Sequence, residues 1–102
     1  MAYVSTVNVG DVLYGPSDEK VGKVTDVISD EGTLEPMWYE VKVGTLGGRH
    51  LIPVGQVEDA GDRWVVPYGK ERVKTAPTAS GVIPLDSERE LLYDHYQWRP
   101  EG

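Results

Sequence analysis

The stretch VGKVTDVISDEGTLEPMWYEVKV, residues 21–43, decides the fold. Its second half, residues 37–43, alternates apolar and polar side chains with a period of two, which is typical of a β-strand with one buried face. A β-branched run at residues 21–29 precedes it, and its spacing predicts that Val24 and Ile28 share one face. The segment DEGT between the two runs contains turn-forming residues and a glycine that can adopt a positive φ. We therefore predict a β-hairpin.

Short strand-like runs recur on both sides of this hairpin. The residues that form them are 11–14, 50–54, 56–58 and 63–67, which brings the number of strand candidates to six. Pro53 lacks the amide donor that a central strand needs, so its strand should lie at an edge or end there. The glycine-rich residues 44–48 read as a tight connection. Such close spacing favours a small β-barrel or sandwich over a βαβ arrangement, which needs long helices between strands.

Composition limits the chain to one small domain. The 102 residues contain no cysteine, 39% are apolar and 26% are charged, as in ordinary globular proteins. The absence of cysteine excludes disulfides, thiolate metal sites and thiol catalysis. The net charge of −7 disfavours nucleic acid and anionic lipid as partners, since both bind clustered Lys and Arg. The basic patch of Lys70, Arg72 and Lys74 is interpreted as a solvated face beside Glu71.

The sequence also bears on location. No apolar run approaches the roughly 20 residues that a membrane span requires, so direct membrane insertion is not expected. The first ten residues show no basic segment followed by an apolar stretch, as an export signal would. We therefore expect a cytoplasmic protein.

The composition changes after residue 74. Residues 75–86 are rich in Ala, Pro, Thr, Ser and Gly, and predict a linker. Ser87 and Glu90 then form the S-x-x-E pattern of a helix start, and apolar residues at helical spacing predict one helix over residues 87–96. Because so short a helix is marginal alone in water, it must dock on its own barrel or on a neighbouring chain.

Residues that could support catalysis or bind metal are few. His50 and His95 lie in different segments, and a structural role is favoured over metal ligation. Asp26 falls on the predicted face of Val24 and Ile28, where a buried carboxylate would need hydrogen-bond donors, and a structural role is again favoured. Neither a nucleophile elbow nor a phosphate loop is present. We expect no catalytic residues, no cofactor and no enzymatic activity.

Three segments together resemble a known family. They are GPSDEKVGKVTDV at residues 15–27, GTLGGRHLIPV at 44–54 and RWVVPYGKERVKTAP at 63–77, and they are similar to the PRC-barrel. The tail SERELLYDHY at residues 87–96 looks like the short helix that ends many stand-alone bacterial members. The resemblance implies a mainly β fold, a small six-stranded PRC-type β-barrel with a short C-terminal α-helix. The expected organisation is a lead at residues 1–10, the barrel at 11–74, the linker at 75–86, and a helix with an aromatic tail at 87–98.

The resemblance also implies a class of function. PRC-barrels are found in the H subunit of photosynthetic reaction centres and in the C-terminal half of a ribosome maturation factor, and they act as scaffolds that bind other proteins. We therefore expect a non-catalytic protein–protein interaction or adaptor module that associates with itself, for example as a homodimer. Two alternatives are an accessory of ribosome maturation or RNA processing, and a cytoplasmic accessory of a membrane photosynthetic electron-transfer complex.

Aromatic residues are the best candidates for partner binding, because aromatic side chains often anchor protein interfaces. The tail carries an apolar set larger than a short helix normally exposes. The predicted partner-binding residues are Leu92, Tyr93, Tyr96, Trp98 and Trp38. In so small a barrel, Trp38 also suits a place in the core. A flexible linker would allow two protomers to exchange the helix.

Overall fold

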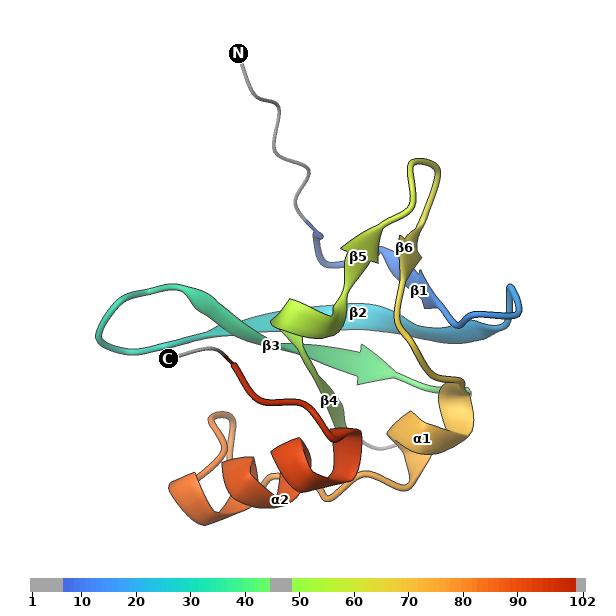
Figure 1. Ribbon diagram of the computed structural model, residues 1–102. Helices are drawn as coiled ribbons and strands as arrows, with labels where there is room; N and C mark the ends of the chain where they lie inside the picture. Colours follow the sequence, from blue (N-terminus) through green and yellow to red (C-terminus); the bar gives the residue numbers. More distant parts are fainter. Residues whose placement is uncertain (1–6, 45–48, 101–102) are drawn as a thin grey trace.

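The computed structural model describes residues 7–44 and 49–100 (Figure 1). The predicted lead at residues 1–10 and connection at 44–48 therefore lie largely outside the described residues. The strands are β1 (Val12–Tyr14), β2 (Lys20–Ser29), β3 (Pro36–Lys42), β4 (His50–Pro53), β5 (Glu58–Asp59) and β6 (Trp64–Val65). A single 3₁₀ turn, η1 (Val54–Gln56), precedes β5, and two helices follow β6: α1 (Lys70–Lys74) and α2 (Asp86–Tyr96).

The strands form one mixed sheet that curls into a half-barrel. In the described residues its order is β4-β3-β2-β1-β6-β5, with β1 and β6 parallel and every other neighbouring pair antiparallel. The prediction of a mainly β, six-stranded PRC-type fold with a C-terminal helix is confirmed. β4 forms one edge of the sheet and ends at Pro53, as the missing amide donor predicts.

The central hairpin joins β2 to β3, as predicted. The Asp30 carboxylate accepts hydrogen bonds from the backbone amides of Gly32 and Thr33, at 2.8 and 3.0 Å. These bonds, the one from Thr33 first, lower the pKa of Asp30. The residue with positive φ is Leu34, at 62°, and not the glycine. Such a conformation is strained for a bulky side chain.

The predicted common face of Val24, Asp26 and Ile28 is wrong. Val24 lies opposite Val41, but Asp26 lies opposite Glu40, so β2 carries one extra residue in a β-bulge. The bulge reverses the alternation, and Ile28 pairs with Trp38, which projects from the face opposite to that of Val41. Asp26 is exposed as a result, and its carboxylate accepts a hydrogen bond from the amide of Val27.

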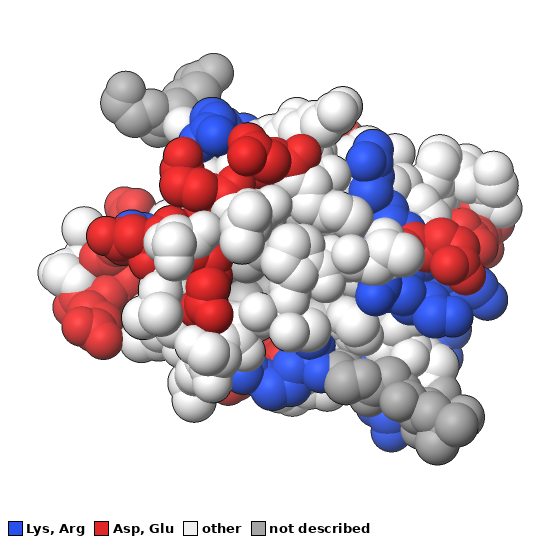
Figure 2. All heavy atoms as spheres, turned by 90° about the horizontal axis from the view of Figure 1, so that it is seen from below, with Lys and Arg blue, Asp and Glu red and all other residues white. Residues whose placement is uncertain are grey.

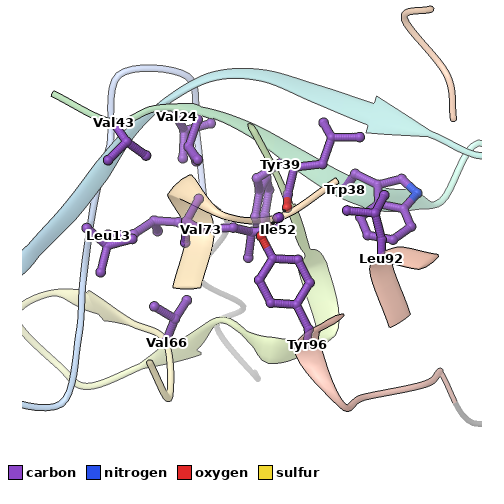
Figure 3. Packing of buried hydrophobic residues seen from close by; sticks show 14 of the residues in the cluster. Leu13, Val24, Trp38, Tyr39, Val43, Ile52, Val66, Val73, Leu92 and Tyr96 are labelled. Atoms are coloured by element: carbon purple, nitrogen blue, oxygen red, sulfur yellow. Dashed lines mark hydrogen bonds between the residues drawn. The ribbon is translucent and has the colours of Figure 1, made fainter. Parts of the chain in front are cut away.

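The core extends over the curled sheet and both helices (Figure 3). α1 contacts β2 and β4 and contributes the fully buried Val73. Lys70, Arg72 and Lys74 are exposed, as expected for a solvated face, but the helix that carries them was not predicted. Side chains buried at 5% exposure or less come from β1 to β4, from both helices and from the chain just after β6, and include Leu13, Val24, Tyr39, Val41, Ile52, Val66, Val73, Leu92 and Tyr96.

The terminal helix begins one residue earlier than predicted, and a different carboxylate caps its N-terminus. The Glu88 side chain accepts hydrogen bonds from the backbone amides of Leu85, at 2.8 Å, and Ser80, at 2.9 Å. Both bonds, the one from Leu85 first, lower the pKa of Glu88. Glu90, which was expected to cap the N-terminus of the helix, forms an ion pair with Arg99 instead. No described helix is long and apolar enough to cross a membrane.

Candidate protein-interaction surface

Four of the five predicted partner-binding residues are buried within the chain. Leu92 has no exposed surface, and Trp38, Tyr96 and Tyr93 are 2%, 3% and 8% exposed. Trp38 and Tyr93 stack with ring centroids 5.4 Å apart. These side chains therefore dock α2 on the sheet of its own chain, with Leu92 beside Trp38 (Figure 3).

A pair of tyrosines extends this docking contact. The Tyr96 hydroxyl donates to the backbone carbonyl of Leu51 at 2.7 Å, and its ring stacks on Tyr68 with centroids 5.0 Å apart. The Tyr68 hydroxyl donates to the side-chain oxygen of Gln56 at 2.8 Å. Burial raises the pKa of both tyrosines well above the ordinary value, because it disfavours the charged form. Both hydroxyls remain neutral donors.

Trp98 is the predicted residue that stays partly accessible. Its ring meets Tyr93 edge-on with centroids 6.2 Å apart, and a side chain at Gly55 would overlap the ring. With Pro36, Met37 and other residues it lines a surface hollow of about 290 Å³. Gln97 takes a left-handed conformation at the end of α2 and turns the chain so that Trp98 reaches this position.

The two histidines lie on different elements, His50 on β4 and His95 on α2. His50 is buried in β4, and its Nδ1 atom has no hydrogen-bond partner among the described residues. Burial, with the nearby charge of Lys74, lowers the pKa of His50. The Nε2 atom of His95 lies 2.6 Å from the backbone carbonyl of Arg72, which fastens α2 to α1.

An exposed apolar segment lies in the predicted linker, where the sequence pattern predicts no site. Val82, Ile83 and Leu85 are 65%, 44% and 60% exposed, and they precede α2 directly. We call residues 82–85 the VIPL segment. The sequence does indicate this segment, since three large apolar side chains in four residues are unusual in a solvated linker. The segment was not predicted as a site because residues 75–86 were interpreted as a flexible linker.

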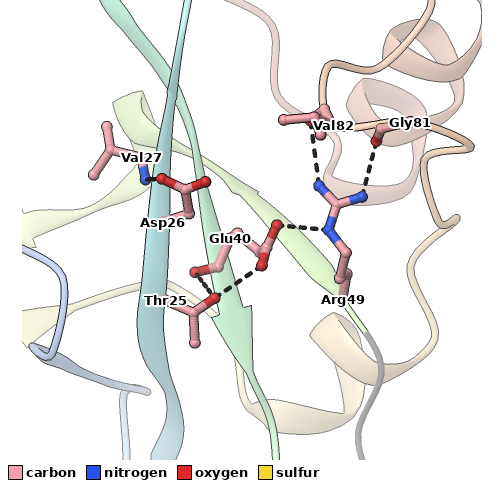
Figure 4. Close-up of polar contacts among 7 residues, drawn as sticks. All are labelled: Thr25, Asp26, Val27, Glu40, Arg49, Gly81 and Val82. Atoms are coloured by element: carbon pink, nitrogen blue, oxygen red, sulfur yellow. Dashed lines mark hydrogen bonds and ion pairs between the residues drawn. The ribbon is translucent and has the colours of Figure 1, made fainter.

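Side chains from elsewhere in the chain hold the backbone at the start of the VIPL segment in place (Figure 4). The Arg49 guanidinium donates to the backbone carbonyls of Gly81 and Val82, at 2.8 and 3.2 Å, and to a Glu40 carboxylate oxygen at 2.6 Å. The other Glu40 oxygen accepts from the Thr25 hydroxyl at 3.0 Å. Glu88 accepts hydrogen bonds from the amide of Leu85, the last residue of the segment, and from the amide of Ser80, just before it, as described above. The segment is held in place, so little conformational entropy is lost when a partner covers it.

The VIPL segment borders a hollow of about 270 Å³ between the hairpin tip and the start of α2. Apolar side chains form one part of its wall, including Ile28, Met37, Trp38 and Ile83. The hairpin tip supplies Asp30 and Glu31 to the other part, and α2 supplies Asp86, which is paired with Arg89. The wall of the hollow thus combines apolar and charged side chains, as protein–protein interfaces commonly do.

Comparison with known proteins identifies part of the chain. The family model described as PRC-barrel domain matches residues 9–73, more than half of the 102 residues. No curated protein matches the chain. The matched region runs from just before β1 to α1, and the VIPL segment and α2 lie beyond it.

Proposed function

The chain belongs to the PRC-barrel family, and we propose that it is a non-catalytic protein-interaction module that binds its partner through the VIPL segment and the adjoining hollow. PRC-barrel domains are generally non-catalytic modules, which agrees with the assignment. The partner that we propose first is a second copy of the chain, which makes the module self-associating.

The exposed and immobilised VIPL segment is the observation that carries this proposal. Three large apolar side chains within four residues, each 44% exposed or more, are an unfavourable surface unless something covers them. The aromatic residues predicted for partner binding have a different part in this proposal. By docking α2 they fix the helix start that follows the segment, and Trp98 alone keeps an accessible face.

A paired substitution tests the proposal. Val82→Asp with Leu85→Asp places two charges on the VIPL segment, and Val9→Asp is the matched control, because Val9 is 61% exposed and lies near β1. Sedimentation velocity over a wide concentration range should show that the wild type and Val9→Asp are larger than the 11.3 kDa monomer. The double variant should remain monomeric. A wild type that is monomeric throughout would refute self-association.

Affinity capture tests the surface for other partners. Proteins retained by the wild type and Val9→Asp, but lost by the double variant, would support an adaptor that uses the VIPL segment. Among them, ribosomal proteins or subunits of an electron-transfer complex would select one of the two alternative roles. Identical protein lists from all three baits would show that this surface is not the binding site.

A further inference from the structure

All five lysines of this acidic chain line one surface hollow. Lys20 and Lys23 come from β2, Lys42 from β3, and Lys70 and Lys74 from α1. The hollow has a volume of about 450 Å³, and its wall also contains Val21, Gly22, Val43 and Gly44. It lies at the α1 end of the molecule, far along β2 from the hairpin tip (Figure 1). In the view of Figure 2 most blue side chains lie toward this end and most red ones toward the other.

Like charges are direct neighbours in this hollow. Lys23 and Lys42 lie opposite each other on the antiparallel strands β2 and β3. Lys70 and Lys74 are four residues apart on α1 and so share a helix face. Both arrangements are destabilising, since opposed like charges on a sheet and at i,i+4 on a helix repel. The fold therefore gathers positive charge here at a cost to its own stability.

The arginines of the chain are used differently. Each one binds an internal acceptor: Arg49 binds Glu40, Arg63 binds Asp18, Arg72 binds the His95 carbonyl, Arg89 binds Asp86, and Arg99 binds Glu90 and Asp94. Of the lysines, only Lys74 makes an ion pair with a described residue, to Glu71 at 3.7 Å. Four ammonium groups in the described part of the chain are thus left for an external anion.

We propose that this lysine hollow binds a compact anion that carries two or more phosphate groups, of the size of inorganic tripolyphosphate or a nucleoside triphosphate. Its volume falls within the range of small-molecule sites, roughly 300–1,000 Å³. Ammonium groups bind as point charges, so charge density matters more than the shape of the acceptor. A phosphate group carries about −1.5 to −2 charges where a carboxylate carries one.

The size of the ligand follows from the charge of the whole chain. The net charge is −7, so a long polyanion such as RNA would extend beyond the hollow over acidic surface. A compact anion stays within about 8 Å of the lysines, the screening length at physiological ionic strength. The acidic hairpin tip of a second copy would suit the lysine hollow less well than a phosphate compound. The Asp30 carboxylate already binds the backbone of its own turn, so only Glu31 and Glu35 would be available to the lysines.

Calorimetric titration with tripolyphosphate, ATP and citrate tests the proposal. Tripolyphosphate should bind, with an affinity that falls as salt is added, and ATP should bind through its triphosphate in the same way. Lys23→Gln with Lys70→Gln should weaken tripolyphosphate binding by tenfold or more. Arg89→Gln with Arg99→Gln changes the net charge equally, on α2 and just after it, and should leave binding unchanged.

Each of these titrations has an outcome that would overturn the proposal. The hollow is not a phosphate site if the wild type binds neither phosphate compound, if both double variants weaken binding equally, or if citrate binds as tightly as tripolyphosphate. The lysine variant should unfold at the same temperature as the wild type or higher, because it relieves like-charge repulsion, so loss of binding cannot be attributed to unfolding. Val82→Asp with Leu85→Asp should retain phosphate binding, which separates this inference from the proposed function.

Discussion

Replacing Leu92 by alanine measures how firmly the terminal helix is docked on the half-barrel. The Leu92 side chain is fully buried, and the substitution removes three carbon atoms from the core. At about 0.8 kcal/mol for each buried methylene, the transfer of these atoms contributes about 2.4 kcal/mol. The cavity that remains adds to this cost, and measured losses for such substitutions are about 2–5 kcal/mol. A domain of this size has a total stability of about 5–15 kcal/mol, so the loss is a large fraction of it.

The adjacent residue provides a matched control. Leu91 is 57% exposed on the same helix, and Leu91→Ala alters helix propensity in the same way as Leu92→Ala. We expect the exposed substitution to change stability by no more than about 0.5 kcal/mol. Urea unfolding, followed by tryptophan fluorescence, should show a much lower midpoint for Leu92→Ala than for Leu91→Ala or the wild type. A slope near 1 kcal/mol per molar urea makes the expected shift about 2 M or more.

Two results would refute this reasoning. If both variants unfold at the wild-type midpoint, α2 is not docked in solution as the structure shows. If the midpoint of the wild type rises with protein concentration and that of Leu92→Ala does not, Leu92 is buried against a neighbouring protomer. The second result would mean that copies of the chain exchange their terminal helices.

Two further predictions concern single polar groups. Tyr96→Phe removes the donor to the Leu51 carbonyl and should cost about 1–3 kcal/mol in urea unfolding, because a buried acceptor is left unpaired. Tyr93→Phe, whose hydroxyl has no such bond to a described residue, should cost less, and equal losses would contradict the assignment. The lowered pKa of His50 means that the unfolded chain takes up a proton at a higher pH than the folded chain. Stability should therefore fall as the pH drops below about 6.5, the unfolded value, toward the folded pKa. His50→Gln should flatten this dependence between pH 7 and about pH 5 while His95→Gln retains it, and an unchanged slope in His50→Gln would contradict the reasoning.

Much of the sheet was predictable because its signals are local. The alternation in residues 37–43 and the turn at Asp30 specify the central hairpin, and Pro53 marks an edge through its missing donor. The bulge in β2 was not predictable in this way. The bulge depends on how β2 pairs with β3, and no residue near Thr25 indicates that the alternation of side chains between the two faces of the sheet reverses there.

The candidate interaction surface was missed for a related reason. Residues 75–86 have the composition of a flexible linker, and only tertiary contacts show that the VIPL segment is held in place. Arg49 and Glu88 make these contacts, and neither forms a recognisable motif with the segment. The aromatic tail was identified correctly as an apolar set that must be covered, but its sequence does not say which surface covers it. The lysine hollow was not predictable because it needs α1, a helix that the sequence pattern did not indicate, to lie beside the lysines of β2 and β3.

The position of β1 has a consequence for how the chain folds as it is synthesised. β1 is hydrogen-bonded on one side to β2, its neighbour in sequence, and on the other to β6, where Leu13 lies beside Trp64. The hairpin can form early, but one side of β1 stays open until almost the whole barrel has left the ribosome. Among the described elements α2 is made after all the strands, and Trp38 has no stacking partner until then. Nascent chains that pause before residue 86 should therefore expose this tryptophan, and they should be the species most prone to aggregate.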